Sequence, residues 1–413
     1  MPAPSPQFAL LAIGILLLAT VVAGSFSSRF GLPALIGFLG LGMLAGVDGP
    51  GGIAFDNYLL TQSVGVACLI FILFSGGLDT DWKAVRKVAL PALCLATFGV
   101  IISAGTIAVS AALIFDMTLL QGALLGAVVA STDAAAVFAI LRSTGLDVDG
   151  DVPALIEFES GTNDPMAIFL VGAVLLLMAA PAAPLTGMAV DFGQQMTMGG
   201  LIGVAAGWMM PELLKRSAYP DGGTAFVIPI AGALVAYGLA EAAGGNGFLA
   251  AYVAGLVAGN RVYAARKMVS TFQDGIAWLA QVVMFLTLGL LVTPTNLGDV
   301  ILPGVAITFI LMLVARPLSV FLCLAPFRRY GWREKLFVSW AGLRGAVPIV
   351  LATFPIVAGV PGAFAIFNVV FFVVVLSSLI QGPTVKPVAE WLGIARMNGG
   401  EAPEPKPRVP QGF

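Results

Sequence analysis

The sequence has no histidine, only three cysteines and few charged residues. Asp, Glu, Lys and Arg make up 10% of its 413 residues, whereas a soluble domain has about 25%, so a soluble fold is excluded. Without histidine, proton chemistry near neutral pH must fall to carboxylates. Cys68, Cys94 and Cys323 lie in apolar runs and have no motif partner at short spacing, which indicates neither a zinc site nor a disulfide.

Long apolar runs fill most of the chain. Hydrophobic residues make up 59% of it, and runs of about 17 to 25 residues, enough to cross the hydrocarbon of a bilayer, recur throughout. An all-α polytopic membrane protein is therefore predicted rather than a barrel. Two runs are short for a crossing, which leaves the count open by one or two. The thirteen predicted spans are about 7–27, 33–47, 59–78, 88–115, 118–142, 153–179, 196–214, 224–242, 247–260, 276–293, 299–323, 335–355 and 363–382.

The basic residues predict the topology. Alternate connections and the C-terminal segment hold 18 of the 20 Lys and Arg residues, and the opposite connections hold none. Because cytoplasmic loops are enriched in Lys and Arg, we expect the N-terminus outside and the C-terminus in the cytoplasm. The start MPAPSPQ lacks the basic region of a secretory signal, so the first run is expected to stay in the membrane. Residues 397–413, rich in Pro, Gly and charge, are expected to form a disordered tail.

The segment ESGTNDP, residues 159–165, interrupts an apolar run with two carboxylates. Asp164 lies about twelve residues into its span, roughly 18 Å deep, where an ionisable group costs at least about 2.5 kcal/mol on insertion scales. Pro165 cannot donate to the carbonyl of Gly161, and Ser160 and Asn163 add further oxygen atoms. This set of hard oxygen ligands predicts an alkali-cation site. The alternative is a proline kink beside a permanently protonated Asp164.

Six further ionisable residues lie inside predicted spans. Glu159 and Asn163 share one helix face, while Ser160 and Asp164 share another. Glu159 is expected to pair with a buried arginine, because an uncompensated charge at this depth is strongly destabilising. The other five are Asp133, Arg316, Arg344, Glu157 and Glu241. Glu157 and Glu241 lie nearer span ends and are expected at the membrane interface. Glu157 could instead line an access funnel.

Two spans carry signals for a break in the membrane. Residues 131–133, Ser-Thr-Asp, form a helix-cap triplet in the middle of span 118–142, although a continuous helix with Asp133 facing a neighbour is the alternative. Span 335–355 has Gly342, Gly345 and Pro348 around Arg344. The two spans are seven apart and so run in opposite directions, which is typical of an inverted repeat with two broken, crossing helices.

These breaks predict how the membrane domain, residues 1–396, is divided. The core that holds the site is expected at about 88–179 and 299–382, and the scaffold for dimerisation at about 7–78 and 196–293. The core charges are Asp133, Glu159 and Asp164 against Arg316 and Arg344, which leaves one negative charge. A proton or one monovalent cation can neutralise it, so competition at Asp164 predicts electroneutral one-for-one exchange. The neutral Asn163 argues against unequal stoichiometry.

ESGTNDP, STDAAA and GLRGAVP together resemble the NhaP-type cation:proton antiporters. The run STDAAAVFAILRSTGL and the proline after Asn163-Asp164 are similar to the bacterial potassium/proton branch, the cell volume regulation antiporters, and the resemblance covers residues 7–390. It implies an NhaA/NhaP-like fold, a dimer of thirteen-helix protomers in the bacterial inner membrane, elevator-like motion of the core, and a role in pH and volume homeostasis. It also implies that Asp164, Thr132 and Ser160 bind the transported alkali cation, with Glu159 or Asp133, and that Arg344 or Arg316 pairs with Glu159.

The same resemblance sets limits on other expectations. Branch members usually continue into a cytoplasmic regulatory domain, so a truncated form or a minimal relative is expected. We expect no enzymatic activity, no cofactor and no nucleic acid; the partners are K⁺ or Na⁺, protons and lipid. Preference for sodium or lithium stays open, since ligand types alone do not distinguish alkali ions. A sodium-coupled organic-solute carrier is less well supported, because no second anion pocket is visible, and a passive channel lacks a repeated carbonyl filter.

Overall fold

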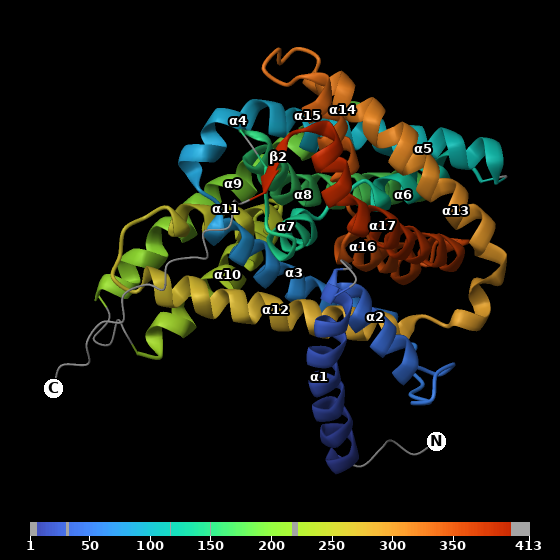
Figure 1. Cartoon of the computed structure of the whole chain (residues 1–413), viewed down its shortest axis with the longest axis horizontal. Coiled ribbons are helices and arrows are strands. Elements are labelled where there is room, and N and C mark those ends of the chain that lie inside the picture. The colour runs from blue at the N-terminus through green and yellow to red at the C-terminus, as the bar shows by residue number, and fades with distance from the viewer. Residues whose placement is uncertain (1–5, 30–32, 116, 149, 217–221, 398–413) are drawn as a thin grey trace.

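Figure 1 shows the computed structural model of the chain, which describes all residues except 1–5, 30–32, 116, 149, 217–221 and 398–413. It is almost entirely helical, as predicted. The elements are α1 (Pro6–Arg29), α2 (Ala34–Ala45), α3 (Tyr58–Asp79), α4 (Trp82–Cys94), η1 (Leu95–Gly99), α5 (Val100–Ile114), α6 (Leu119–Val129), α7 (Ala134–Ser143), β1 (Leu146–Val148), α8 (Val152–Ala179), α9 (Leu185–Arg216), α10 (Thr224–Ala242), α11 (Gly247–Gly259), α12 (Arg266–Leu291), η2 (Pro294–Val300), α13 (Ile301–Ile310), η3 (Leu311–Ala315), α14 (Arg316–Leu324), α15 (Trp332–Trp340), α16 (Ala346–Val357), α17 (Ala363–Leu392) and β2 (Ala395–Met397).

Eight helical segments among the described residues are long and apolar enough to cross a membrane, and four further apolar helices are shorter. The count of thirteen spans therefore stays a prediction. Several predicted boundaries differ from the structure: α12 begins at Arg266 rather than at about 276, α17 continues to Leu392 rather than to about 382, and the connection expected at 180–195 is helical from Leu185 onward. The stretch that follows Leu185 contains no proline before Pro211, so nothing in its backbone prevents the helix from beginning early.

Local capping explains where several helices begin. The Asn57 side chain accepts from Leu60 N at 2.9 Å at the start of α3, and Asp81 accepts from Lys83 N at 2.8 Å at the start of α4. Thr118 forms a reciprocal capping box at the start of α6. Such side chains satisfy backbone donors that the first turn of a helix leaves free, and so they fix the connections between spans.

Two pairs of interruptions divide the helices around the centre of the molecule. The π-helical segments η1 and η3 interrupt the runs 82–114 and 301–324. The runs 119–143 and 332–357 are each split by a short non-helical stretch. Nothing in the sequences of η1 and η3 explains why these segments are π-helical. Turns of π-helix are, however, frequent at functional sites. Both pairs fall in spans that are seven apart in the predicted order.

Close helix packing surrounds α11. Cβ atoms at Gly77 of α3 or at Gly255 of α11 would collide with backbone atoms of the facing helix. On another side, Gly199, Gly203 and Gly207 of α9 lie directly against backbone carbonyls of Asn246 and α11 at the same four-residue spacing. Small residues let helix backbones approach closely inside a membrane. Helix α11 is therefore held firmly between α3 and α9.

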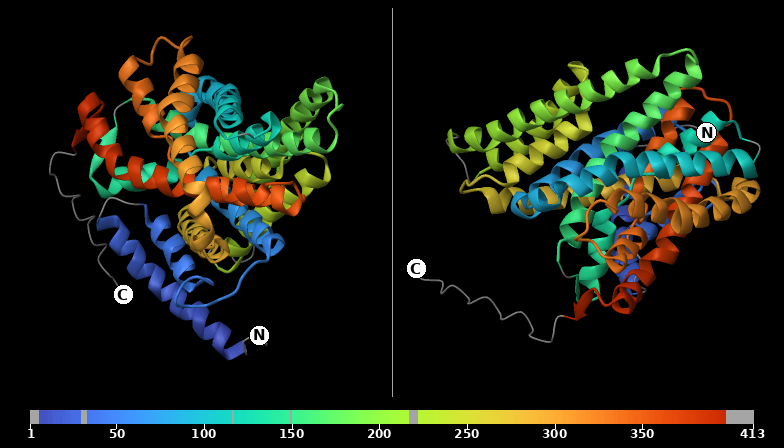
Figure 2. Two further views of the ribbon diagram at one scale, coloured as in Figure 1. Left: turned by 90° about the vertical axis from the view of Figure 1, so that its right-hand side faces the viewer. Right: turned by 90° about the horizontal axis from the view of Figure 1, so that it is seen from above.

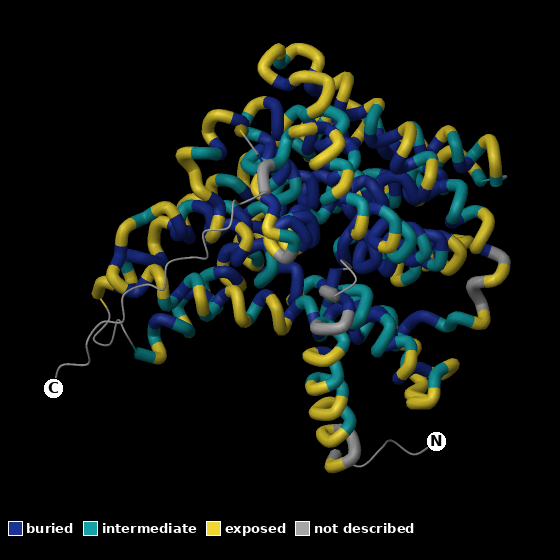
Figure 3. The backbone as a smooth tube through the Cα atoms, viewed as in Figure 1, coloured by how far each residue is buried: buried dark blue, intermediate teal, exposed yellow. Residues whose placement is uncertain are grey.

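Figure 1 also shows how the helices are distributed in space. In Figure 1, α1–α3 and α9–α12 occupy the lower and left parts, while α5, α6, α13, α14, α16 and α17 occupy the right and upper parts. Figure 2 shows α1 running along one side of the molecule. The buried residues gather in the centre, and the exposed ones lie on the outer faces of the helices (Figure 3). A two-stranded sheet pairs β1 with β2, Leu146 opposite Met397, so Met397, the first residue of the predicted tail, is ordered, while 398–413 lie outside the described residues.

Candidate functional site

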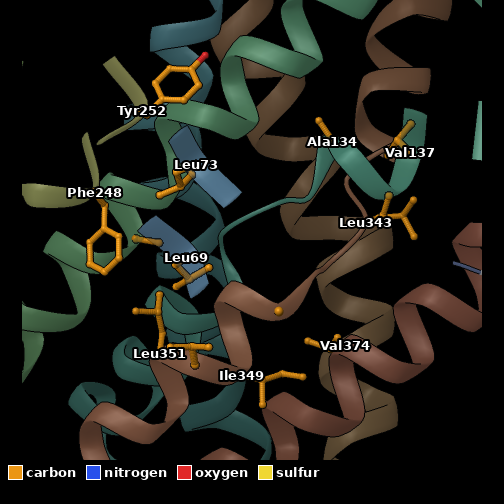
Figure 4. Packing of buried hydrophobic residues seen from close by; sticks show 14 of the residues in the cluster. Leu69, Leu73, Ala134, Val137, Phe248, Tyr252, Leu343, Ile349, Leu351 and Val374 are labelled. Carbon is orange, nitrogen blue, oxygen red and sulfur yellow. The ribbon is translucent and has the colours of Figure 1, made fainter. Parts of the chain in front are cut away.

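The two broken helices meet at their breaks. Helix α6 ends at Val129 and α7 begins at Ala134, while α15 ends at Trp340 and α16 begins at Ala346. In Figure 4 the extended stretch before Ala134 lies beside the extended stretch that holds Leu343. A hydrogen bond from Asp133 N to Leu343 O, 2.8 Å long, joins them. The breaks predicted from the cap triplet and from the glycines around Arg344 are both confirmed.

Charged side chains lie at the ends of the half-helices. Asp133 Oδ1 accepts from Ala136 N at 3.1 Å and caps α7. The same carboxylate lies against Gly345, the residue before α16, so closely that a Cβ there would collide with it. Arg344 Nη1 donates to Ala130 O and Ser131 O, each at 2.6 Å, just beyond the end of α6. A carboxylate at positive helix N-termini and a guanidinium at a negative C-terminus both stabilise the broken arrangement.

Helix α8 brings its polar residues against the first break and runs unbroken through Pro165. Asp164 is 6% exposed, and Ser131 Oγ donates a hydrogen bond to its Oδ1. Asn163 Nδ2 donates to Thr132 Oγ1 at 2.6 Å, and Ser160 Oγ donates to Thr132 O at 2.9 Å. The structure therefore brings together the predicted cation-site residues Asp164, Asn163, Ser160, Thr132 and Asp133.

Glu159 lies on the other face of α8 in a buried ion pair. Arg316 Nη1 and Nη2 donate to Glu159 Oε1 and Oε2 at 2.5 and 2.8 Å, with the side chains 5% and 1% exposed. Arg316 follows η3 directly. Of the two arginines that the sequence offered as partners, Arg316 is the one that binds Glu159, and Arg344 binds the backbone of the break instead. Both oxygens of Glu159 are therefore already engaged by the guanidinium.

A cavity of about 440 Å³ reaches Asp164. Thr132, Asp133 and Ser160 line it, together with Glu157 and with Arg142, which belongs to the connections that hold the basic residues. Glu157, for which an access funnel was the alternative, therefore faces the cavity. Glu241, the other residue expected at the interface, accepts from Gly247 N at 2.9 Å beside the start of α11. Asp164 thus lines the same cavity as the other residues of the predicted cation site.

Several residues that position the site were not singled out from the sequence. Ser131 was seen only as part of a cap, although its hydroxyl binds Asp164. From α17, Gln381 Nε2 donates to Trp340 O at 2.8 Å, where α15 ends, and Ser378 Oγ donates to Arg344 O at 3.4 Å. The sequence contained a signal for these residues, because polar side chains in the middle of an apolar run need hydrogen-bond partners. Which partners they find depends on contacts far apart in the chain.

Comparisons with known proteins identify the family of the chain. The family described as "Sodium/hydrogen exchanger, transmembrane" matches residues 15–391. The K(+)/H(+) antiporter NhaP2 of Shewanella oneidensis is 45% identical over 380 residues, 91% of this chain and 66% of that protein. The K(+)/H(+) antiporter NhaP of Alkalimonas amylolytica is 42% identical over 388 residues, 93% of this chain and 66% of that protein. This chain therefore spans slightly less than two thirds of the length of these relatives.

A solved structure shares the fold. The sodium proton antiporter MjNhaP1 from Methanocaldococcus jannaschii superposes with a TM-score of 0.79, which covers 93% of this chain and 99% of that one at 21% sequence identity. At this identity the similarity concerns the fold alone.

Proposed function

We propose that this chain, which belongs to the sodium/hydrogen exchanger family, is a secondary antiporter that exchanges a monovalent cation for a proton across a membrane. The observation that carries the proposal is the position of Asp164. It is a buried carboxylate that lines a cavity, and it forms no ion pair with a described residue. A buried carboxylate in such a place requires a proton or a cation to neutralise it.

The surrounding charges explain why a single ion is exchanged. Glu159 and Arg316 neutralise each other, while Asp133 and Arg344 compensate the ends of half-helices. Asp164 is then the one charge left over, and proton and cation compete for it. If only the neutralised site moves between the two sides of the membrane, each cation carried one way requires a proton carried back. Exchange is therefore one-for-one and electroneutral.

The cation ligands follow from the same contacts. Asp164 supplies a carboxylate, Thr132 and Ser160 supply hydroxyl groups, and Asn163 Oδ1 is buried without a hydrogen-bond partner. Asp133 lies beside them and Glu159 is taken by Arg316, so of these two Asp133 is the better candidate for a ligand. Potassium is the favoured cation because the relatives that are 42–45% identical are named K(+)/H(+) antiporters. Sodium or lithium is the alternative, and a sodium-coupled organic-solute carrier is a weaker one.

The proposed architecture rests on the paired interruptions. A core of about 88–179 and 299–382 moves against a scaffold of about 7–78 and 196–293, in a homodimer of thirteen-span protomers whose broken helices cross. Support comes from the two breaks and from the two π-helical segments, each pair in spans that are seven apart. The cavity reaches Asp164 from the side rich in basic residues, which corresponds to an inward-open state with the N-terminus outside and the C-terminus in the cytoplasm of a bacterial inner membrane.

The purified protein in proteoliposomes with an internal pH dye tests the proposal. An addition of potassium should move protons without a requirement for membrane potential, and parallel runs with sodium and lithium give the selectivity. Asp164→Asn should abolish this movement, because the site then cannot take up a proton, while Asp191→Asn, at an exposed position in α9, should retain it. Exchange that survives in Asp164→Asn contradicts the proposal, and cation flux that follows potential without proton movement indicates a channel.

A further inference from the structure

The amide of Asn246 joins the scaffold to the core next to Asp164. Asn246 Nδ2 donates to Pro165 O at 3.2 Å, and Pro165 directly follows Asp164 in α8. Asn246 is 3% exposed, so water does not compete freely for this bond. Its other atoms are fixed within the scaffold, since its backbone N donates to Gln195 O of α9 at 2.9 Å and its Oδ1 accepts from Leu249 N at 2.9 Å.

This bond differs from other side-chain hydrogen bonds between the proposed scaffold and the proposed core. Among the described residues, those of Asn260 to Thr80 O and Trp82 N and that of Asp48 to Thr295 lie where the chain itself passes from one group to the other. Because the chain links core and scaffold at these points, those segments would stay close even if the proposed core moved against the proposed scaffold. Asn246 and Pro165 are about 80 residues apart in the chain, so their contact persists only in conformations that bring α8 and α11 together at this height.

The bond lies on the side of Asp164 that the cavity does not reach. Asn246 is the last residue of the connection 243–246, which holds no basic residue, whereas the opposite end of α11 leads to Arg261. Beyond Asp164 on that side, Met166 packs in an apolar cluster with Phe169 and Phe192, whose rings are 4.9 Å apart. On the cavity side, α8 meets α11 through Gly161, where a Cβ would collide with the Tyr252 ring. The α8–α11 contact is therefore tight but carries its hydrogen bond only at the closed end.

We infer that the Asn246–Pro165 hydrogen bond is the outer gating contact, which stabilises the conformation with the site open to the cavity and breaks when the site opens to the other side. This rests on the proposed alternating access. Asn246 is then a positioning residue that sets the equilibrium between the two conformations without touching the cation. Loss of a hydrogen bond worth about 1 kcal/mol shifts a two-state equilibrium by about fivefold.

Cysteine labelling measures this equilibrium directly. Cys68, Cys94 and Cys323 are replaced by alanine, and a single reporter is introduced. Gly76→Cys lines the cavity at an open position and reports the conformation seen here. Ala167→Cys lies three residues beyond Asp164, on the same side of α8, and is fully buried in this conformation, so its maleimide labelling reports opening to the other side.

The test variant is Asn246→Ser, which keeps a helix-capping oxygen but is too short to reach Pro165. Asn57→Ser is the matched control, since Asn57 caps α3 in the same way and its side chain forms no hydrogen bond with a described residue of the core. In Asn246→Ser we expect labelling at Ala167→Cys to rise about fivefold while labelling at Gly76→Cys falls; Asn57→Ser should change neither. If the serine variant does not assemble, the same labelling is measured in Asn246→Asp, which also keeps a capping oxygen but has no amide group to donate to Pro165 O.

Unchanged labelling, or a rise at both reporters, overturns the inference, because a rise at both means that the packing has only loosened. Proteoliposome exchange by the cysteine-free parent separates this inference from the proposed function. If the parent exchanges cations for protons but Asn246→Ser labels like the parent, only the gating role fails. If the parent does not exchange, the proposed function fails whatever the labelling shows.

Discussion

Replacement of Arg316 by methionine tests how the charges of the site are divided. The change removes the guanidinium and keeps a long apolar side chain, so it leaves Glu159 buried and unpaired. Both side chains are almost fully buried and joined by two hydrogen bonds. Removal of one partner from a buried pair of this kind costs about 3–5 kcal/mol of stability. Expressed protein should therefore be markedly less stable than the parent.

The expected shift in melting temperature follows from the size of the chain. With an unfolding entropy of about 2.1 cal/mol/K per residue, 413 residues give roughly 0.9 kcal/mol per degree. The loss then corresponds to a fall in Tm of about 3–6 °C. Tryptophan fluorescence of the detergent-purified protein during a slow temperature ramp measures it. Arg329→Met is the control, since Arg329 pairs with Asp151 at 3.4 Å with both side chains about 40% exposed, and such a pair contributes at most about 1 kcal/mol.

A double-mutant cycle identifies the partner. Glu159→Gln combined with Arg316→Met should recover most of the lost stability, because the second change removes the uncompensated charge. Glu159→Gln combined with Arg344→Met should be additive, because Arg344 binds the carbonyls of Ala130 and Ser131 and not Glu159. The reasoning is refuted if Arg316→Met is no less stable than Arg329→Met, or if the coupling appears with Arg344 in place of Arg316.

Two further predictions concern the break beside Asp164. Ser131→Ala should change the pH profile of cation-driven proton movement, because it removes the hydroxyl that donates a hydrogen bond to the Asp164 carboxylate. Ser131→Thr keeps a hydroxyl and should keep the parent profile, whereas an unchanged profile in Ser131→Ala would show that the bond is unimportant. Gly345→Ala should abolish exchange or assembly, because its Cβ would collide with the Asp133 carboxylate, whereas Gly76→Ala, which has open space around it, should behave like the parent in the same flux assay and in size-exclusion chromatography.

The sequence predicted well those features that depend on depth and on local capping. Polar residues inside an apolar run mark the site, because each costs free energy in hydrocarbon wherever the helices pack. The cap triplet that ends at Asp133 located a break for a similarly local reason, since a capping side chain bonds within three residues of itself. The early start of α9 was missed because the weakly apolar residues after Leu185 carry no strong signal for helix or for loop.

Partners distant in the chain were beyond local reasoning, and the two buried arginines show why. Charge balance requires one guanidinium near Glu159, but it does not say which of two spans supplies it. Arg344 stands between glycines at a predicted break, where free carbonyls of helix ends need donors, and it does bond to such carbonyls, those of Ala130 and Ser131. Arg316 directly follows η3 within a helical run, where the backbone carbonyls accept hydrogen bonds from the helix itself. Its guanidinium therefore remains available for a carboxylate. This difference in backbone setting assigns the two roles, and it leaves Asp164 as the carboxylate that no fixed positive charge neutralises.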